Sequence, residues 1–259
     1  MIIDLHNHTV LCNHAEGSME DYVRQAIHNK IKYFGFSEHA YMPFDEGYRI
    51  PKEKMSWYES EIIRLKEFYA DQITILSAYE VDYLPHKMDP DILTRPVDYL
   101  IGSVHFLEEW GFDNPEFIGE YDKRDIDEIW EAYFLAIQKM AEARLFDIVG
   151  HFDLIKVFKF FPKKNMDPTY KKTLEAIKDN DMTLEVNAAG LRKKIGEPYP
   201  SETILAMAYQ MEIPITFGSD AHRPEDVGNG LASVMNMAKR CGYSQCALYK
   251  NRKREMINF

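Results

Sequence analysis

Short apolar runs rich in β-branched and aromatic residues recur along the chain, separated by longer mixed segments. Seven of them stand out: "IIDLH" at 2–6, "YFGFSEH" at 33–39, "ITILSAYE" at 73–80, "DYLIGSVH" at 98–105, "FDIVGH" at 146–151, "MTLEVN" at 182–187 and "IPITFGSDAH" at 213–222. Runs of this length and composition predict strands, most of them buried.

Between most of these runs lie segments with apolar residues at helical spacing. Residues 18–30 begin with Ser18 and carry Asp21 three positions later, which predicts a helix that starts with a capping box. Further helices are predicted at 52–70, 124–144, 168–180, 201–211 and 231–240. Strands that alternate with helices predict a parallel α/β sheet, either open and doubly wound or closed into a barrel.

The ends of the predicted strands favour the barrel. Each strand ends in a histidine, a carboxylate or an amide: His6, His8, Glu38, His39, Glu80, His105, His151, Asn187, Asp220 and His222. A closed parallel barrel brings all its strand ends around one mouth, whereas an open sheet gathers ligands mainly at a switch point. Seven strands therefore predict a distorted (β/α)7 TIM-like barrel. Because no linker or repeat divides the chain, we expect one domain over residues 1–259.

Composition narrows the choice of partners and location. The 42 acidic residues exceed the 31 basic ones, and the formal charge of −11 disfavours a nucleic-acid-binding surface. Three cysteines, an odd number, argue against a secreted disulfide framework. The sequence lacks a signal-peptide pattern and an apolar run of membrane-spanning length, so we expect a cytoplasmic protein without membrane association. Nothing in the sequence specifies an oligomeric state.

The first strand carries an H-x-H pair that could bind a metal ion. Side chains alternate along a strand, so Asp4, His6 and His8 share one face, and the two histidines can chelate one ion. We expect Asp4, one pleat deeper, to accept a hydrogen bond from a ligand imidazole. When an H-x-H pair occurs alone, its histidines are more often hydrogen-bonded to other protein groups or to water, on the surface or in the core, than bound to a metal ion.

The other strand-end residues also have ordinary interpretations when taken singly. Glu38 and His39 fit a turn cap, Glu80 fits a paired carboxylate, and Asp220 with His222 fits an Asx turn. Yet seven of the nine histidines lie at or just beyond predicted strand ends. Burying several unpaired ionisable groups together at one rim of the barrel would cost folding free energy. Binding of metal ions would explain why all of these residues lie there.

These motifs resemble the polymerase and histidinol phosphatase (PHP) family of metal-dependent phosphoesterases, along the full length of the chain. The matching residues are His6 and His8, His14, Glu38 and His39, Glu80, "GSVH" at 102–105, "GH" at 150–151 and "SDAH" at 219–222. Two longer stretches, "GSVHFLEEWGFDNPEF" and "NAAGLRKKIGEPYPS", look like the histidinol-phosphate phosphatase branch.

The resemblance implies a trinuclear metal site. Its first ion would be held by His6, His8, Glu80 and Asp220, its second by His105 and His151 together with Glu80, and its third by His14, His39 and His222. An imidazole-rich donor set suits zinc, iron or manganese. Three divalent ions would make the pocket cationic within an acidic protein and attract a phosphate dianion.

The implied activity is hydrolysis of L-histidinol phosphate to L-histidinol and phosphate, a step of histidine biosynthesis. A hydroxide that bridges the first two ions would attack phosphorus, and Asp220 could relay its proton. Arg192 could clamp the phosphate, although it also fits a solvated basic turn, and Lys156 and Lys159 are further phosphate candidates.

Other functions remain open at this stage. A PHP-type enzyme could act on another phosphate ester, such as a nucleotide or phosphotyrosine. The chain could instead be a metal-binding accessory module. An amidohydrolase barrel is disfavoured, because no strand-end lysine stands ready to bridge two ions.

Overall fold

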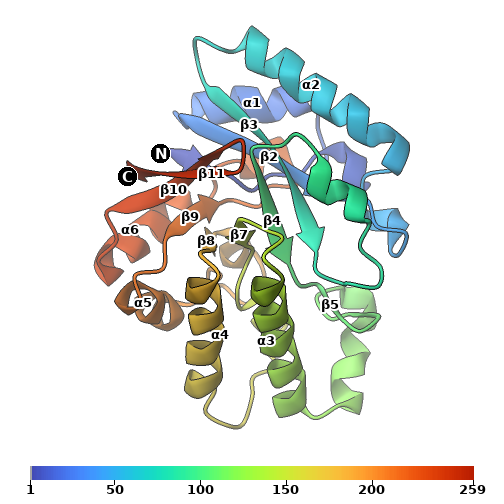
Figure 1. The fold of residues 1–259 in the computed structure, drawn as a ribbon, viewed down its shortest axis with the longest axis vertical. Helices are drawn as coiled ribbons and strands as arrows, with labels where there is room; N and C mark the ends of the chain where they lie inside the picture. Colours follow the sequence, from blue (N-terminus) through green and yellow to red (C-terminus); the bar gives the residue numbers. More distant parts are fainter. Residues whose placement is uncertain (1) are drawn as a thin grey trace.

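The computed structural model describes residues 2–259, and its centre is a sheet of seven parallel strands (Figure 1). In spatial order these are β1 (Ile3–Asp4), β2 (Tyr33–His39), β3 (Thr74–Asp82), β4 (Tyr99–Ser103), β7 (Ile148–Val149), β8 (Thr183–Asn187) and β9 (Ile215–Gly218). All seven predicted strands are present, and every neighbouring pair is parallel. Spatial order follows chain order throughout.

The first and last strands of the sheet meet, so the barrel is nearly closed. The Leu5 amide donates to the Phe217 carbonyl at 2.9 Å, and the His8 amide donates to the Ala221 carbonyl at 2.9 Å. β1 and β7 have only two residues each with regular pairing, which makes the barrel uneven. The prediction of a distorted (β/α)7 barrel is confirmed.

Helices surround the barrel (Figure 1). They are α1 (Met19–His28), α2 (Met55–Phe68), α3 (Ile126–Ala143), α4 (Asp167–Asp179), α5 (Glu202–Gln210) and α6 (Leu231–Cys241). Short 3₁₀ helices join them: η1 (Val10–Cys12), η2 (Glu46–Tyr48), η3 (Lys52–Lys54), η4 (Pro90–Thr94), η5 (Pro115–Lys123), η6 (Leu154–Lys156), η7 (Ala189–Arg192) and η8 (Pro224–Asp226). Each predicted helix is confirmed, and Ser18 and Asp21 form the predicted capping box at the start of α1.

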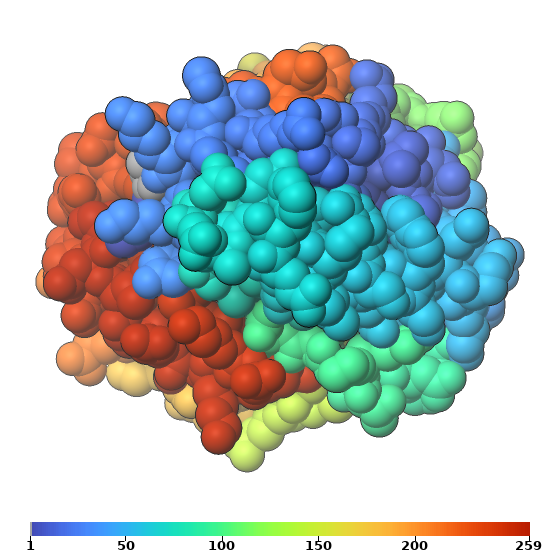
Figure 2. All heavy atoms as spheres, turned by 90° about the horizontal axis from the view of Figure 1, so that it is seen from above, coloured from blue at the N-terminus to red at the C-terminus, as the bar shows by residue number. Residues whose placement is uncertain are grey.

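Two antiparallel hairpins were not predicted. β5 (Phe106–Leu107) and β6 (Trp110–Gly111) follow β4, and β10 (Gln245–Lys250) and β11 (Lys253–Asn258) end the chain. The second hairpin packs against the N-terminal ends of the barrel strands. There the Arg252 amide donates to the carbonyl of Asp98, just before β4, at 2.8 Å. In the view from above, this C-terminal segment forms a continuous surface with the N-terminal part of the chain (Figure 2). The N-terminal ends of the strands are thereby covered, and the polar residues gather at the opposite end.

One hydrophobic cluster of buried side chains runs from Ile3 to Tyr249 and fills the space around the sheet. Phe34 and Phe36 pack edge to face within it, with ring centroids 5.0 Å apart. None of the helices formed by residues 2–259 is long and apolar enough to cross a membrane.

Candidate metal centre

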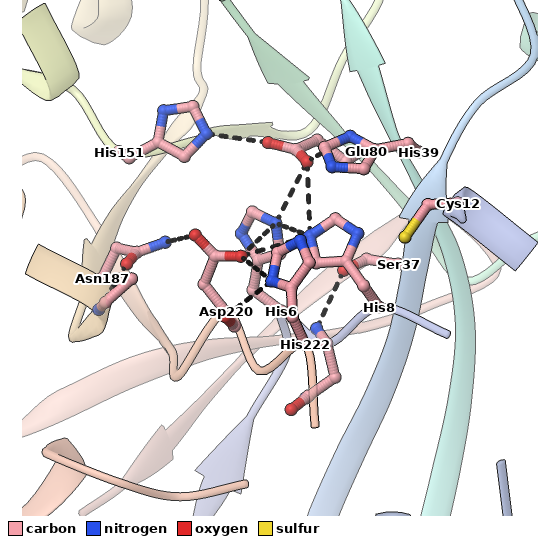
Figure 3. A network of polar contacts seen from close by, with 12 residues as sticks. His6, His8, Cys12, Ser37, His39, Glu80, His151, Asn187, Asp220 and His222 are labelled. Atoms are coloured by element: carbon pink, nitrogen blue, oxygen red, sulfur yellow. Dashed lines mark hydrogen bonds and ion pairs between the residues drawn. The ribbon is translucent and has the colours of Figure 1, made fainter. Parts of the chain in front are cut away.

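Nine side chains that the sequence singles out come together at the C-terminal ends of the strands. We call them the donor cluster: His6, His8, His14, His39, Glu80, His105, His151, Asp220 and His222. Figure 3 shows most of them, with Glu80 and Asp220 lying among the imidazole rings. Within the cluster, the donor atoms fall into three groups.

The first group consists of His6, His8, Glu80 and Asp220. The two Nε2 atoms of His6 and His8 are 3.1 Å apart, and they lie 3.3 and 3.5 Å from Glu80 Oε2. Asp220 Oδ1 is 3.2 Å from His8 Nε2 and 3.8 Å from His6 Nε2. Ligand atoms about 2.1 Å from a tetrahedral ion lie roughly 3.4 Å from one another. The observed spacing therefore fits one ion at the centre of the group.

The second group shares Glu80 with the first. His151 Nε2 lies 2.8 Å from Glu80 Oε1, and His105 Nε2 lies 3.7 Å from the same oxygen. Each oxygen of Glu80 therefore faces a different group, an arrangement in which one carboxylate can bridge two ions.

The third group contains only imidazoles, those of His14, His39 and His222. Ring centroids of His14 lie 5.3 Å from His39 and 4.7 Å from His222, and the rings are tilted rather than stacked. One nitrogen of each ring lies within 4.8 Å of the others. His14 is the most exposed of the three, so this group faces the mouth of the barrel.

Burial and charge set the protonation of these groups. Burial disfavours a charged His8, but its hydrogen bonds to the Asp220 and Glu38 carboxylates raise its pKa to about 9. Burial also disfavours the charged form of His105, but the negative charges of Asp82 and Glu80 raise its pKa to about 10. Burial would also raise the pKa of Glu80, yet the surrounding imidazoles hold it well below its usual value. Without metal, His8 and His105 are therefore protonated, and the carboxylates that stabilise these protons would also stabilise a metal cation.

Several buried ring nitrogens lack a hydrogen-bond partner among residues 2–259. They are Nδ1 of His8, His39 and His151, although Nδ1 of His39 lies 3.0 Å from Glu80 Oε2 and Nδ1 of His8 lies 3.5 Å from Glu38 Oε1, in poor alignment for a hydrogen bond. Of these atoms only His39 Nδ1 faces a carboxylate of the donor cluster, and a cation between it and Glu80 would satisfy both. The donor spacing in the three groups shows that the side chains fit divalent metal ions.

Two ligand residues also have unusual backbones. His151 has a φ of 20° and Asp220 a φ of 54°. Positive φ is uncommon for residues other than glycine, and it persists where surrounding contacts enforce it. Each residue lies two positions after a strand end, β7 for His151 and β9 for Asp220, so the chain turns sharply at the C-terminal ends of these strands.

Asp4 does not play the role predicted for it. Its carboxylate accepts hydrogen bonds from the Ser219 amide at 2.8 Å, the Ser219 hydroxyl at 2.6 Å and the Gly228 amide at 3.0 Å. Asp4 therefore fastens the loop that carries Asp220. The prediction was wrong because strand alternation gives a side chain's direction but not its partner.

Other carboxylates, which the sequence analysis missed, support the imidazoles instead. His6 Nδ1 donates to Glu185 Oε1 at 2.7 Å, and His105 Nδ1 donates to Asp82 Oδ1 at 2.9 Å. Asp82 is in turn paired with buried Arg49 at 2.8 Å. Asp82 could have been found from its position two residues after Glu80, on the same face of β3.

Cys12 was likewise not considered near the metals. Its sulfur lies within 4.8 Å of a nitrogen of His8 and one of His222, and Figure 3 shows it beside the cluster. The thiol donates to the Thr9 carbonyl at 3.1 Å, and burial raises its pKa. Cys12 is therefore held as a neutral thiol. No disulfide forms among the three cysteines of the described chain.

The three predicted phosphate ligands differ in their surroundings. Arg192 is half-buried, and its guanidinium donates to the carbonyls of Ser219 at 2.7 Å and Asp220 at 3.2 Å. Lys159 is exposed on the loop after β7, with a φ of 66°. Arg192 alone of the three touches the backbone of a donor residue.

Lys156 lies in a buried ion pair. Its ammonium is 2.8 Å from Asp153 Oδ2 and donates to the Pro198 carbonyl at 2.8 Å. Withdrawing Lys156 to bind phosphate would leave a buried carboxylate unpaired. The structure therefore does not favour Lys156 as a phosphate ligand.

Comparison with known proteins supplies the family context. The family model described as PHP domain matches residues 4–189, and the model described as PHP-associated matches residues 202–239. The "probable histidinol-phosphatase" of Deinococcus radiodurans is 33% identical over 258 residues, which cover 97% of this chain and 98% of that protein. The histidinol-phosphatase of Bacillus subtilis is 31% identical over 257 residues, covering 87% and 95%.

A solved structure shows the same fold. Histidinol phosphate phosphatase from Lactococcus lactis, complexed with zinc, L-histidinol and phosphate, matches with a TM-score of 0.83 at 20% identity. The match covers 98% of both chains.

Proposed function

Since the chain belongs to the PHP domain family, we propose that it is a histidinol-phosphatase, a phosphomonoesterase that converts L-histidinol phosphate to L-histidinol and phosphate. The observation that carries the proposal is the convergence of nine donor side chains in one cluster, in a chain whose full-length relatives are named for this activity. A cytoplasmic setting and a single domain over residues 1–259 are further predictions of the proposal.

The three groups of the donor cluster would hold divalent ions: His6, His8, Glu80 and Asp220 the first, Glu80, His105 and His151 the second, and His14, His39 and His222 the third. Zinc, iron and manganese all suit this donor set. When bound, such ions lower the pKa of water to give a nucleophile and offset negative charge on the phosphoryl oxygens.

The chain's own residues orient and protonate the reactants. Asp220 is the proposed proton acceptor for the attacking water. Its Oδ1 faces His8 and its Oδ2 accepts from Asn187 Nδ2 at 3.3 Å. Burial opposes its charge, but His6, His8 and His222 hold its pKa well below the usual value. The carboxylate is therefore ionised at neutral pH, the form that can accept a proton.

Arg192 is the proposed contact for the phosphate. It is only partly buried and donates from Nη2 to the Ser219 and Asp220 carbonyls, beside the first group. Its Nη1 donates to the Asn229 carbonyl at 3.2 Å and its Nε lies 3.4 Å from Asp226 Oδ1, so a phosphate would have to displace some of these contacts. A planar guanidinium can donate two parallel hydrogen bonds to a phosphate.

The test is phosphate release from a panel of esters by metal-replete protein, with elemental analysis before and after chelation. L-histidinol phosphate should exceed nucleotides and phosphotyrosine in kcat/KM by at least about tenfold. A smaller preference points to a PHP-type phosphatase with another substrate. Full metal content without hydrolysis of any ester points to an accessory module.

A further inference from the structure

We propose that Glu185 is a positioning residue that holds the ligands of the first and second groups in one fixed arrangement. This inference rests on the proposed function, because it concerns how the same metal centre is assembled.

The first contact of Glu185 sets the direction of His6. Glu185 lies on β8 and is 1% exposed, and its Oε1 accepts from His6 Nδ1 at 2.7 Å. With the carboxylate oxygen as acceptor, the imidazole proton of His6 is on Nδ1. Nε2 of His6 is thereby left with its lone pair free and faces Glu80 Oε2 at 3.3 Å.

The second contact sets the backbone of His151. Oε2 of Glu185 accepts from the His151 amide at 2.8 Å and from Asn187 Nδ2 at 3.1 Å. The amide belongs to the residue whose φ is 20°. One carboxylate therefore stabilises an uncommon backbone after β7 and an imidazole after β1.

The surrounding chain leaves room for this carboxylate. A Cβ atom at Gly218 on β9 would lie 2.2 Å from Glu185 Oε1 and 2.5 Å from the His6 Cβ. Neither distance is physically possible without rearrangement. Strands β1, β8 and β9 are thus built around the contact between Glu185 and His6.

The variant Glu185→Gln tests whether Glu185 acts through its two hydrogen-bond acceptors or only through the volume of its side chain. The amide has nearly the same size, but it offers one acceptor and one donor group, whereas His6 and His151 both present N–H groups. Either one of the two contacts is lost, or His6 accepts from the new amide at Nδ1 and carries its proton on Nε2, the nitrogen that faces the first group. The third group should be unaffected, since Glu185 makes no hydrogen bond to His14, His39 or His222 within residues 2–259.

Asp98→Asn provides a matched control. Asp98 is also a buried carboxylate that accepts a backbone amide, that of Ser77 at 2.9 Å, but it precedes β4 at the opposite end of the barrel. Any general effect of replacing a buried carboxylate should appear in both variants.

The experiment is titration of the full, metal-depleted chain with Co²⁺, followed by visible absorption and by elemental analysis after gel filtration. We expect Glu185→Gln to weaken Co²⁺ binding about 10–100-fold for two of the three ions and leave the third unchanged. Asp98→Asn should bind all Co²⁺ as the wild type does. Glu185→Asp keeps two acceptors, so it should recover part of the lost affinity.

Three outcomes overturn the proposal: unchanged Co²⁺ affinities in Glu185→Gln, equal weakening for every ion, or the same weakening in Asp98→Asn. If Glu185→Gln does not fold, the comparison of Glu185→Asp with the wild type decides in the same way. The titration uses no substrate. Failure of the wild type to hydrolyse L-histidinol phosphate would therefore count against the proposed function alone.

Discussion

At the residue scale, four donor imidazoles are held at Nδ1 by a protein oxygen and leave Nε2 free: His6, His14, His105 and His222. His105 is the clearest case, since Asp82 accepts from its Nδ1 at 2.9 Å while its Nε2 points toward Glu80. Arg49 holds Asp82 in turn. Such support directs the free nitrogen at a metal and adds to ligand basicity.

His105→Asn should therefore remove a ligand without disturbing the core. We expect kcat for L-histidinol phosphate to fall at least about 100-fold, together with loss of metal, because even residues that only support ligands are worth 10–100-fold. Steady-state kinetics, elemental analysis and circular dichroism measure the effects. His28→Asn, on α1 and outside the donor cluster, is the control. Full metal content and wild-type turnover in His105→Asn would show that His105 is not a ligand.

The raised pKa values of His8 and His105 predict how pH affects the metal-free protein. Both groups keep a proton in the folded state up to about pH 9–10, but lose it near pH 6.5 when unfolded. Their stabilising contribution is complete below pH 6.5 and is lost as pH rises through the folded pKa.

We therefore expect the melting temperature of chelated protein to fall between pH 6.5 and 9. Bound metals replace these protons, so metal affinity should rise over the same range. Calorimetry of chelated wild type and chelated His105→Asn checks the sign, since the variant should show a shallower fall. A melting temperature that rises over this range contradicts the assignment.

At the element scale, helices are anchored by local signals that do not depend on the metal centre. The Ser18 hydroxyl accepts from the Asp21 amide, and the Asp21 carboxylate accepts from the Ser18 amide at 3.1 Å. This reciprocal cap satisfies two backbone donors that the first turn of α1 leaves free.

Ser18→Ala should lower the free energy of unfolding by about 0.5–2 kcal/mol and leave kcat unchanged. Denaturant unfolding and steady-state kinetics measure the two effects. Ser60→Ala serves as the control, because Ser60 is an exposed residue inside α2 whose hydroxyl donates to the Ser56 carbonyl one helical turn earlier. Equal destabilisation by the two changes would rule out a specific capping contribution.

At the scale of the whole molecule, one end of the barrel is covered by the C-terminal hairpin and the other end carries the donor cluster. The C-terminal hairpin covers one end through Arg252, which pairs with Asp147 and donates to the Leu145 carbonyl at 2.9 Å. The donor cluster occupies the other end and draws on residues from position 6 to position 222. Ions bound there would tie together strands from both edges of the sheet.

Removal of metal should therefore destabilise the whole barrel. An ion present at 1,000 times its dissociation constant stabilises the folded state by about 4 kcal/mol. We expect chelation to abolish hydrolysis and lower the melting temperature, and return of metal to restore both. Return of metal to chelator-treated protein is also the control for direct effects of the chelator. An unchanged melting temperature after complete metal loss would contradict this prediction.

Most of the donor cluster could be predicted because its members follow strands that are recognisable from local pattern alone. The donors lie at strand ends, and a closed parallel barrel brings strand ends together. Glu185 could not be assigned in this way. It lies inside the apolar run "TLEVN", where alternation does not reveal which imidazole it meets.

Local sequence by itself determined the seven barrel strands, the helices, the capping of α1 and the types of donor at each strand end, since these depend on neighbours a few positions apart. Only the tertiary structure decided which carboxylate supports which imidazole, and that Lys156 pairs with Asp153. His6 and Glu185 are separated by 179 positions, and their contact exists only because the barrel closes. The physical reason is that closure depends on packing of the whole sheet, which no short stretch of sequence contains.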